Sequence, residues 1–140
     1  MSDSFFLDTN IYVYSLDRSA PEKARIAAQW IRSGLVSGNG VISYQVIQEF
    51  FNVAMRKFAQ WMSPSDAEHF LQTVFRPMPQ VQPSHELFSE ALRIKDRYSL
   101  GWYDSLVVAA AQKAGCRRLL TEDLQHGQTF GSLRVENPFL

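Results

Sequence analysis

Short apolar runs alternate along the chain with longer segments in which apolar residues recur about every 3.6 positions. Residues 44–58 show this helical period most clearly, whereas residues 4–7 form a short apolar run typical of a buried strand. The pattern predicts strands at residues 4–7, 40–43, 78–82, 117–121 and 133–136. It predicts helices at residues 21–34, 44–58, 64–75, 84–98 and 103–115.

Capping residues support these helix boundaries. Pro21 lies near the start of the first predicted helix, and Ser63 followed by Pro64 is typical of a helix start. Gly34 and Gly115 follow the last apolar positions of two helices, so we expect the helices to end there. Pro79 restricts the 78–82 segment to the edge of a sheet.

Strands separated by helix-length segments predict right-handed crossovers. The expected fold class is therefore α/β, a three-layer α/β/α sandwich with a central parallel sheet of four or five strands. Its 140 residues contain 46% apolar side chains and no long linker or repeat, so we expect one domain over residues 1–140.

The composition excludes several protein classes. The single cysteine, Cys116, excludes an internal disulfide framework and indicates a reducing, cytoplasmic location. No apolar run is long enough to cross a membrane, and the start Met-Ser-Asp-Ser does not have the pattern of a signal peptide. A formal net charge of zero argues at first against a nucleic-acid partner.

Four acidic residues lie close to the predicted strand ends. Asp8 and Asp123 follow strands, Asp104 lies in the first turn of the 103–115 helix, and Glu49 lies a turn and a half into the helix after the second strand. In open parallel sheets, binding sites form beyond the carboxyl ends of the strands, and all four can be placed there. Glu49 and Asp104 lie next to apolar positions, where an isolated carboxylate is costly. A divalent cation would account for such a cluster, because Mg²⁺ prefers hard oxygen ligands. Each acid can also be explained separately, as a helix cap, a helix-dipole charge or an exposed residue.

The segments LDTNIYVYSLD, VISYQVIQEFFNVA, YDSLVVAAA and LLTEDLQHG, in this order and spacing, resemble the PIN-domain ribonucleases. The likeness is greatest to the VapC-type toxins of bacterial toxin–antitoxin pairs, and it covers essentially the whole chain. It implies an endoribonuclease that depends on one or two Mg²⁺ or Mn²⁺ ions. The family's acids fall on Asp8, Glu49, Asp104 and Asp123, with Asn10 and Thr121 as supporting polar residues. Ser105 stands where many relatives carry alanine.

The resemblance also implies partners. These are an RNA substrate, a small antitoxin and, as a further expectation, a second copy of the chain in a homodimer. We expect the antitoxin to insert a basic side chain into the acidic pocket and to cover apolar surface around the first and third predicted helices. Within the pocket, we expect Asp8 and Asp104 to bind metal, while either Glu49 or Asp123 activates the attacking water.

Setting the four pocket acids aside makes the charge compatible with RNA. Of the 14 acidic residues, ten then remain against 14 basic ones. Basic residues that could contact phosphate, although an ordinary solvated surface charge is the favoured explanation for each, are Arg18, Lys23, Arg56, Lys57, Arg93, Lys95 and Arg97.

Several assignments stay open. We expect His126 to end a short helix at Gly127 rather than to act in catalysis. Trp61, Phe70 and Phe75 fit either the core or a partner surface. An aspartyl-phosphate phosphatase is disfavoured because Asn10 stands where it needs a second aspartate, and a receiver domain because its lysine after the last strand is missing. A catalytically inactive PIN-like scaffold that binds RNA or protein is the remaining alternative.

Overall fold

The computed structural model describes residues 3–140. Residues 1–2, which belong to the segment used above to exclude a signal peptide, lie outside this range. The strands are β1 (Phe5–Leu7), β2 (Gly40–Ser43), β3 (Gln80–Val81), β4 (Arg118–Leu120), β5 (Thr129–Phe130) and β6 (Leu133–Glu136). The helices are α1 (Thr9–Ser15), α2 (Pro21–Ser37), α3 (Tyr44–Lys57), α4 (Pro64–Phe70), the π-helical turn η1 (Leu71–Phe75), α5 (His85–Tyr98) and α6 (Trp102–Lys113).

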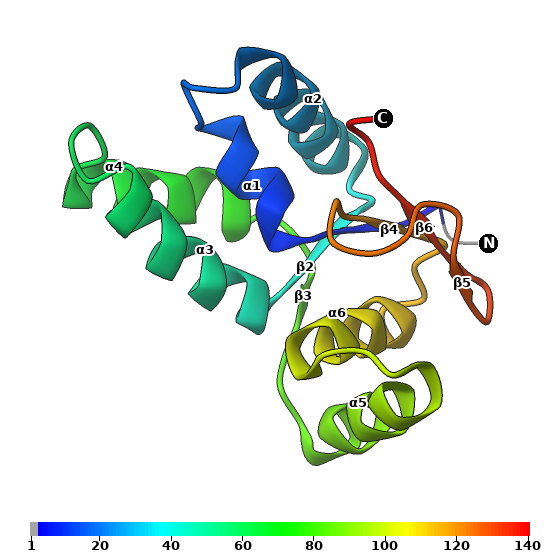
Figure 1. Ribbon diagram of the computed structural model, residues 1–140. Helices are drawn as coiled ribbons and strands as arrows, with labels where there is room; N and C mark the ends of the chain where they lie inside the picture. Colours follow the sequence, from blue (N-terminus) through cyan, green and yellow to red (C-terminus); the bar gives the residue numbers. More distant parts are fainter. Residues whose placement is uncertain (1–2) are drawn as a thin grey trace.

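The strands form a single sheet in the order β3-β2-β1-β4-β6-β5. Every pairing is parallel except the one between β5 and β6. Helices α1 and α2 lie on one side of this sheet, and α5 and α6 lie on the other (Figure 1). The predicted α/β class is therefore confirmed, and the sheet is parallel as predicted except at the β5–β6 pair.

The sheet has one strand more than the four or five predicted. The extra strand, β5, is only two residues long and turns back on β6 across Gly131, whose φ is 62°. A pair of residues carries no periodic signal, so the hydrophobic pattern could not reveal this strand.

The prediction that α2 ends before Gly34 was wrong. The helix continues to Ser37 and ends at Gly38, which has a left-handed φ of 76°. Gly34 is buried inside the helix because α2 approaches β2 closely there: a Cβ on Gly34 would lie 2.9 Å from Gly40 Cα. The glycine therefore serves close packing rather than helix termination.

The expectation for His126 was also wrong. Residues 122–128 contain no helix, and His126 lies on an exposed turn where its Nδ1 accepts a hydrogen bond from the Asn137 backbone N–H at 3.0 Å. Gly127, at a φ of 86°, forms part of this turn. A glycine with positive φ occurs both at helix ends and in turns, so the sequence alone did not distinguish the two.

An aromatic cluster fills the core between α3 and the α4–η1 segment. Phe75 is fully buried, and the rings of Phe50 and Phe70 stack with their centroids 4.8 Å apart. Trp61 is half-buried against Phe58, with ring centroids 4.8 Å apart. These contacts assign Trp61, Phe70 and Phe75 mainly to packing. No helix among residues 3–140 is long and apolar enough to cross a membrane.

Candidate active site

The strand order brings Asp8 and Thr121 together although 113 residues separate them. β1 and β4 are adjacent and parallel, so Asp8 after β1 and Thr121 after β4 emerge at the same edge of the sheet. Thr121 Oγ1 donates a 2.8 Å hydrogen bond to Asp8 Oδ2, and the Thr9 backbone N–H donates to Asp8 Oδ1 at 2.7 Å. Asp8 is therefore both the N-cap of α1 and the buried centre of the site.

Asn10 and Thr121 hold Asp123 in place. Asn10 Nδ2 donates to Thr121 Oγ1 and to Asp123 Oδ2, each at 3.1 Å, and the Asp123 backbone N–H donates to Thr121 Oγ1 at 3.0 Å. The Thr121 hydroxyl thus accepts two hydrogen bonds and donates one to Asp8. Both residues predicted as supporting polar groups lie in this network.

Glu49 reaches the same region from α3. Its Oε1 accepts hydrogen bonds from Thr9 Oγ1 at 3.2 Å and from Gln45 Nε2 at 3.0 Å. Gln45 and Thr9 were not predicted as site residues. The signal for Gln45 was its position four residues before Glu49, which places both on one face of the helix.

Asp104 lies in the first turn of α6, where the sequence placed it. Its half-buried carboxylate accepts no hydrogen bond from any of residues 3–140. Burial raises its pKa, and the negative charges of Asp123 and Glu49 raise it further. Asp104 on α6 therefore lies within electrostatic range of Asp123 and Glu49.

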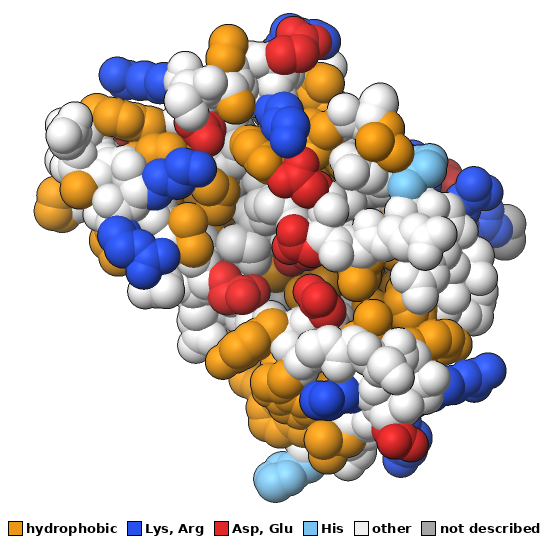
Figure 2. Space-filling model, in the orientation of Figure 1, with side chains coloured by type: hydrophobic (Ala, Val, Ile, Leu, Met, Phe, Trp, Pro, Cys, Tyr) orange, Lys and Arg blue, Asp and Glu red, His pale blue; other side chains and the backbone are white. Residues whose placement is uncertain are grey.

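Asp8 has a strongly raised pKa. Burial, the largest cause, raises the pKa of Asp8 from 3.8 to about 7. The hydrogen bonds from Thr9 and Thr121 oppose this rise, while the charges of Asp123 and Glu49 add to it. Figure 2 shows Asp and Glu side chains gathered at the centre of the face above the strand ends.

The donor set fits a divalent cation in its chemistry. It consists of carboxylate oxygens, the ligands that Mg²⁺ and Mn²⁺ prefer. A bound cation would stabilise the ionised carboxylates and so lower the pKa of Asp8 and Asp104. As they stand, no three His, Cys, Asp or Glu side chains within residues 3–140 are grouped closely enough to hold a metal ion. Repulsion between like charges opposes closer approach of the oxygens in the absence of a cation.

A second cluster supports the loop that carries Asp123. Glu122 accepts hydrogen bonds from the Tyr14 hydroxyl at 2.5 Å and from Lys23 Nζ at 2.7 Å, and Lys23 also lies over the Tyr14 ring. Lys23 is consequently the predicted basic residue that is tied most directly to the site. Glu122 was missed because its spacing does not distinguish it from a surface acid.

The other basic candidates are not brought to the pocket carboxylates. Lys57 pairs with Asp17 at 3.1 Å, and Arg93 pairs with Glu90 on its own helix. Arg18 stacks on Trp61, and Arg97 lies over the Tyr98 ring. Arg56 and Lys95 are exposed. A role of these six residues in RNA binding stays a prediction.

Comparison with known proteins identifies the family of this fold. The PIN domain profile matches residues 5–129, so the chain belongs to the PIN-domain family. This confirms the family predicted from the four sequence segments. No curated protein sequence matches the chain significantly.

Solved structures share the fold at low sequence identity. A toxin–antitoxin complex from Klebsiella pneumoniae superposes with a TM-score of 0.70 at 18% identity, covering 96% of this chain and 98% of the other. VapC20 of Mycobacterium tuberculosis, described as a toxin that cleaves the sarcin–ricin loop, gives 0.57 at 18% identity over 83% and 87%. The protein PAE2754 of Pyrobaculum aerophilum gives 0.59 at 19% identity over 88% and 83%.

Proposed function

We propose that the chain is a metal-dependent endoribonuclease and the toxin of a toxin–antitoxin pair. The observation that carries this proposal is the group of carboxylates at the carboxyl edge of the sheet, centred on a buried Asp8 whose pKa is raised to about 7. A buried acid with like-charged neighbours is costly for a fold and is useful for binding a cation. The fold shared with a VapC toxin supports the same conclusion.

The residues of the pocket would have different roles in phosphodiester hydrolysis. Asp8 and Asp104 would hold Mg²⁺ or Mn²⁺, with Glu49 and Asp123 completing the pocket. A divalent ion bound there would supply charge neutralisation on the phosphate and an activated water. Asn10 and Thr121 would orient Asp8 and Asp123, and either Glu49 or Asp123 would accept the proton of the attacking water.

The test is cleavage by the purified protein. With Mg²⁺ or Mn²⁺ it should cut RNA and leave 5′-phosphate and 3′-hydroxyl ends, and EDTA should stop the reaction. Products with 2′,3′-cyclic phosphates formed without metal would overturn the mechanism, because that chemistry uses the hydroxyl of the RNA itself. RNA binding with no cleavage and no metal binding in calorimetry would instead identify an inactive scaffold.

An antitoxin is the proposed partner, since a nuclease that is active in the cytoplasm would damage its own cell. An Arg or Lys of the antitoxin would enter the pocket and pair with Asp8, Glu49 or Asp104. An apolar groove of about 370 Å³ between α1, α2 and α4, which includes Leu16 and Ile31, would accept an apolar segment. The fold shared with a toxin–antitoxin complex supports this proposal.

Competition with metal tests the inhibition. Rising Mg²⁺, into the tens of millimolar, should weaken it, because the ion and the basic side chain would occupy the same acids. Inhibition that is indifferent to Mg²⁺, and to neutralising the basic side chains of the antitoxin, would show a purely steric block. A homodimer is the remaining proposal on assembly, and light scattering of the purified chain tests it.

A further inference from the structure

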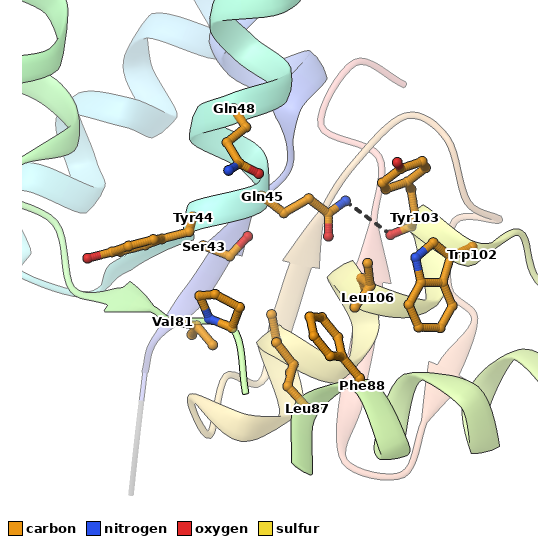
Figure 3. A pocket seen from close by; sticks show the side chains of 12 residues that line it. Ser43, Tyr44, Gln45, Gln48, Val81, Leu87, Phe88, Trp102, Tyr103 and Leu106 are labelled. Carbon is orange, nitrogen blue, oxygen red and sulfur yellow. Dashed lines mark hydrogen bonds between the residues drawn. The ribbon is translucent and has the colours of Figure 1, made fainter. Parts of the chain in front are cut away.

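A cavity with aromatic walls lies beside the acidic pocket. It has a volume of about 270 Å³ and lies between the N-terminal ends of α3 and α6, the segment after β3, and α5. Leu106 and Ala110 of α6 line it together with Leu87 of α5 (Figure 3). Its aromatic walls are Tyr44, Phe88, Trp102 and Tyr103.

Three of the aromatic side chains in the walls are exposed to solvent. Tyr103 is 61% exposed, Phe88 42% and Tyr44 41%. None of the charged residues within 3–140 lines the cavity. Besides the Tyr44 and Tyr103 hydroxyls and the Trp102 N–H, its polar groups are the Ser43 hydroxyl and the amides of Gln45 and Gln48. Flat apolar faces with uncharged donors and acceptors at the edge are the chemistry that binds an unstacked nucleobase.

The cavity is continuous with the acids through shared residues. Gln45 lines it and donates from Nε2 to Glu49 Oε1 at 3.0 Å and to the Tyr103 carbonyl oxygen at 3.4 Å. Tyr103, in turn, directly precedes Asp104. A phosphate held at Glu49 and Asp104 would therefore place one of its neighbouring nucleosides at the mouth of this cavity.

We propose that the cavity holds the unstacked base of a nucleotide next to the cleaved phosphodiester bond and so helps select the cleavage site. This inference rests on the proposed ribonuclease function. The volume lies just below the roughly 300–1,000 Å³ of sites for drug-sized ligands, which suits a single base. Its continuity with the acids favours RNA over a second copy of the chain as the occupant.

Phe88→Ala is the variant that tests the cavity. Leu92→Ala is its control, because Leu92 is on the same helix, is 57% exposed and does not line the cavity. The substrate is chosen by cleaving a single-stranded RNA library with the unaltered protein and sequencing the new 5′ ends. The preferred oligonucleotide is then prepared with an abasic ribose at each position flanking the cut.

Phe88→Ala should lower kcat/KM by roughly 5- to 100-fold on the intact oligonucleotide, as expected for loss of a stacking platform. It should cause no further loss on the oligonucleotide that is abasic at one flanking position, while Leu92→Ala should match the unaltered protein on both. Equal losses on intact and abasic substrates would overturn the proposal. So would a change from dimer to monomer in light scattering, which would show that a second copy covers the cavity.

A binding measurement keeps this inference separate from the nuclease itself. Fluorescence anisotropy would compare Asp104→Asn with the double variant Asp104→Asn and Phe88→Ala, using single-stranded RNA hexamers of each nucleotide and an abasic hexamer. Weaker binding of the double variant to at least one base-bearing hexamer, with no change on the abasic one, supports the cavity. Equal affinities overturn it. A protein that shows this binding but never cleaves RNA would refute the proposed function alone.

Discussion

On the β1–β4 side of the acidic pocket, Asp8 and Asp123 share a hydrogen-bond network with Asn10 and Thr121. On the α3–α6 side, by contrast, Asp104 accepts no hydrogen bond from residues 3–140. The β1–β4 half is therefore fixed by hydrogen bonds. In the other half, Thr9 and Gln45 donate to Glu49, and only Asp104 has no hydrogen-bond donor among residues 3–140. The difference indicates that the first half sets the position of a ligand and that Asp104 has more freedom to adjust to it.

The largest effect on RNA cleavage is expected from removing a single charge in either half of the pocket. Asp8→Asn and Asp104→Asn should each lower RNA cleavage roughly a thousandfold or more, because metal binding supplies several kcal/mol of transition-state stabilisation. The two variants should differ in melting temperature in EDTA. Asp104→Asn should melt higher than the unaltered protein, since it relieves repulsion and breaks no hydrogen bond.

Asp8→Asn should show a smaller rise in melting temperature. Both Asp8 oxygens accept hydrogen bonds, one from the Thr121 hydroxyl and one from the Thr9 N–H. An asparagine has a single acceptor oxygen, so one of these hydrogen bonds is lost whichever way the amide is turned. Differential scanning calorimetry measures both variants. If both melt well below the unaltered protein without metal, the carboxylates are structural caps, and the contrast between the two halves fails.

The metal-free protein should lose stability as the pH rises from about 4 to about 7. The pKa of Asp8 is raised on folding from 3.8 to about 7, so this group favours the folded state fully only below pH 4, and the advantage is lost on ionisation. The loss amounts to roughly 4 kcal/mol. The raised pKa of Asp104 acts in the same direction.

Urea unfolding across this pH range measures the effect. Asp17 and Glu122 have lowered pKa values and act in the opposite direction, so the informative quantity is the difference between the unaltered protein and Asp8→Asn. Saturating Mg²⁺ should make this difference in unfolding free energy less dependent on pH, because the ion stabilises the ionised carboxylates of the pocket. A difference that is independent of pH would mean that Asp8 ionises normally.

Thr121→Val should cost roughly 2–3 kcal/mol of unfolding free energy. The side chain is fully buried, and the methyl group would leave Asn10 Nδ2, the Asp123 N–H and Asp8 without their shared partner. Cleavage should fall roughly 10- to 100-fold, because Asp8 and Asp123 lose their common support. Thr121→Ser keeps the hydroxyl and should restore most of both quantities; equal damage by the two substitutions would mean that the methyl group, not the hydrogen bonds, matters.

The smallest effect is expected at the rim. Lys23→Met removes the ion pair to Glu122, which is partly exposed and screened by solvent. Its melting temperature should be close to that of Arg25→Met, a control on the same helix that loses an exposed ion pair to Glu22. RNA cleavage should change little in either. A large loss of cleavage in Lys23→Met alone would make Lys23 part of the RNA contact surface.

Local chemistry was enough to locate most elements and the candidate acids. Ser63 and Asp66 form the capping box that begins α4, with Pro64 at its first position, and Ser84 caps α5 at the predicted start. Such signals act within one or two turns, so they can be read from neighbouring residues. The same holds for Asp8 and Asp104, whose positions after a strand and in a first helical turn follow from the sequence.

The sequence by itself therefore determined the alternation of strands and helices. It also identified four candidate acids, three of them at strand ends or a helix start and one, Glu49, within a helix. Only the tertiary structure decided that β1 lies beside β4, which joins Asp8 to Thr121, and that Gly34 packs against Gly40 inside the sandwich. It also decided that Asp8 is buried among its neighbours and that Asp104 accepts no hydrogen bond from the described residues, 3–140. The reason is physical: caps and periodicity are local, whereas strand order, close packing and charge repulsion depend on residues that the chain brings together from far apart.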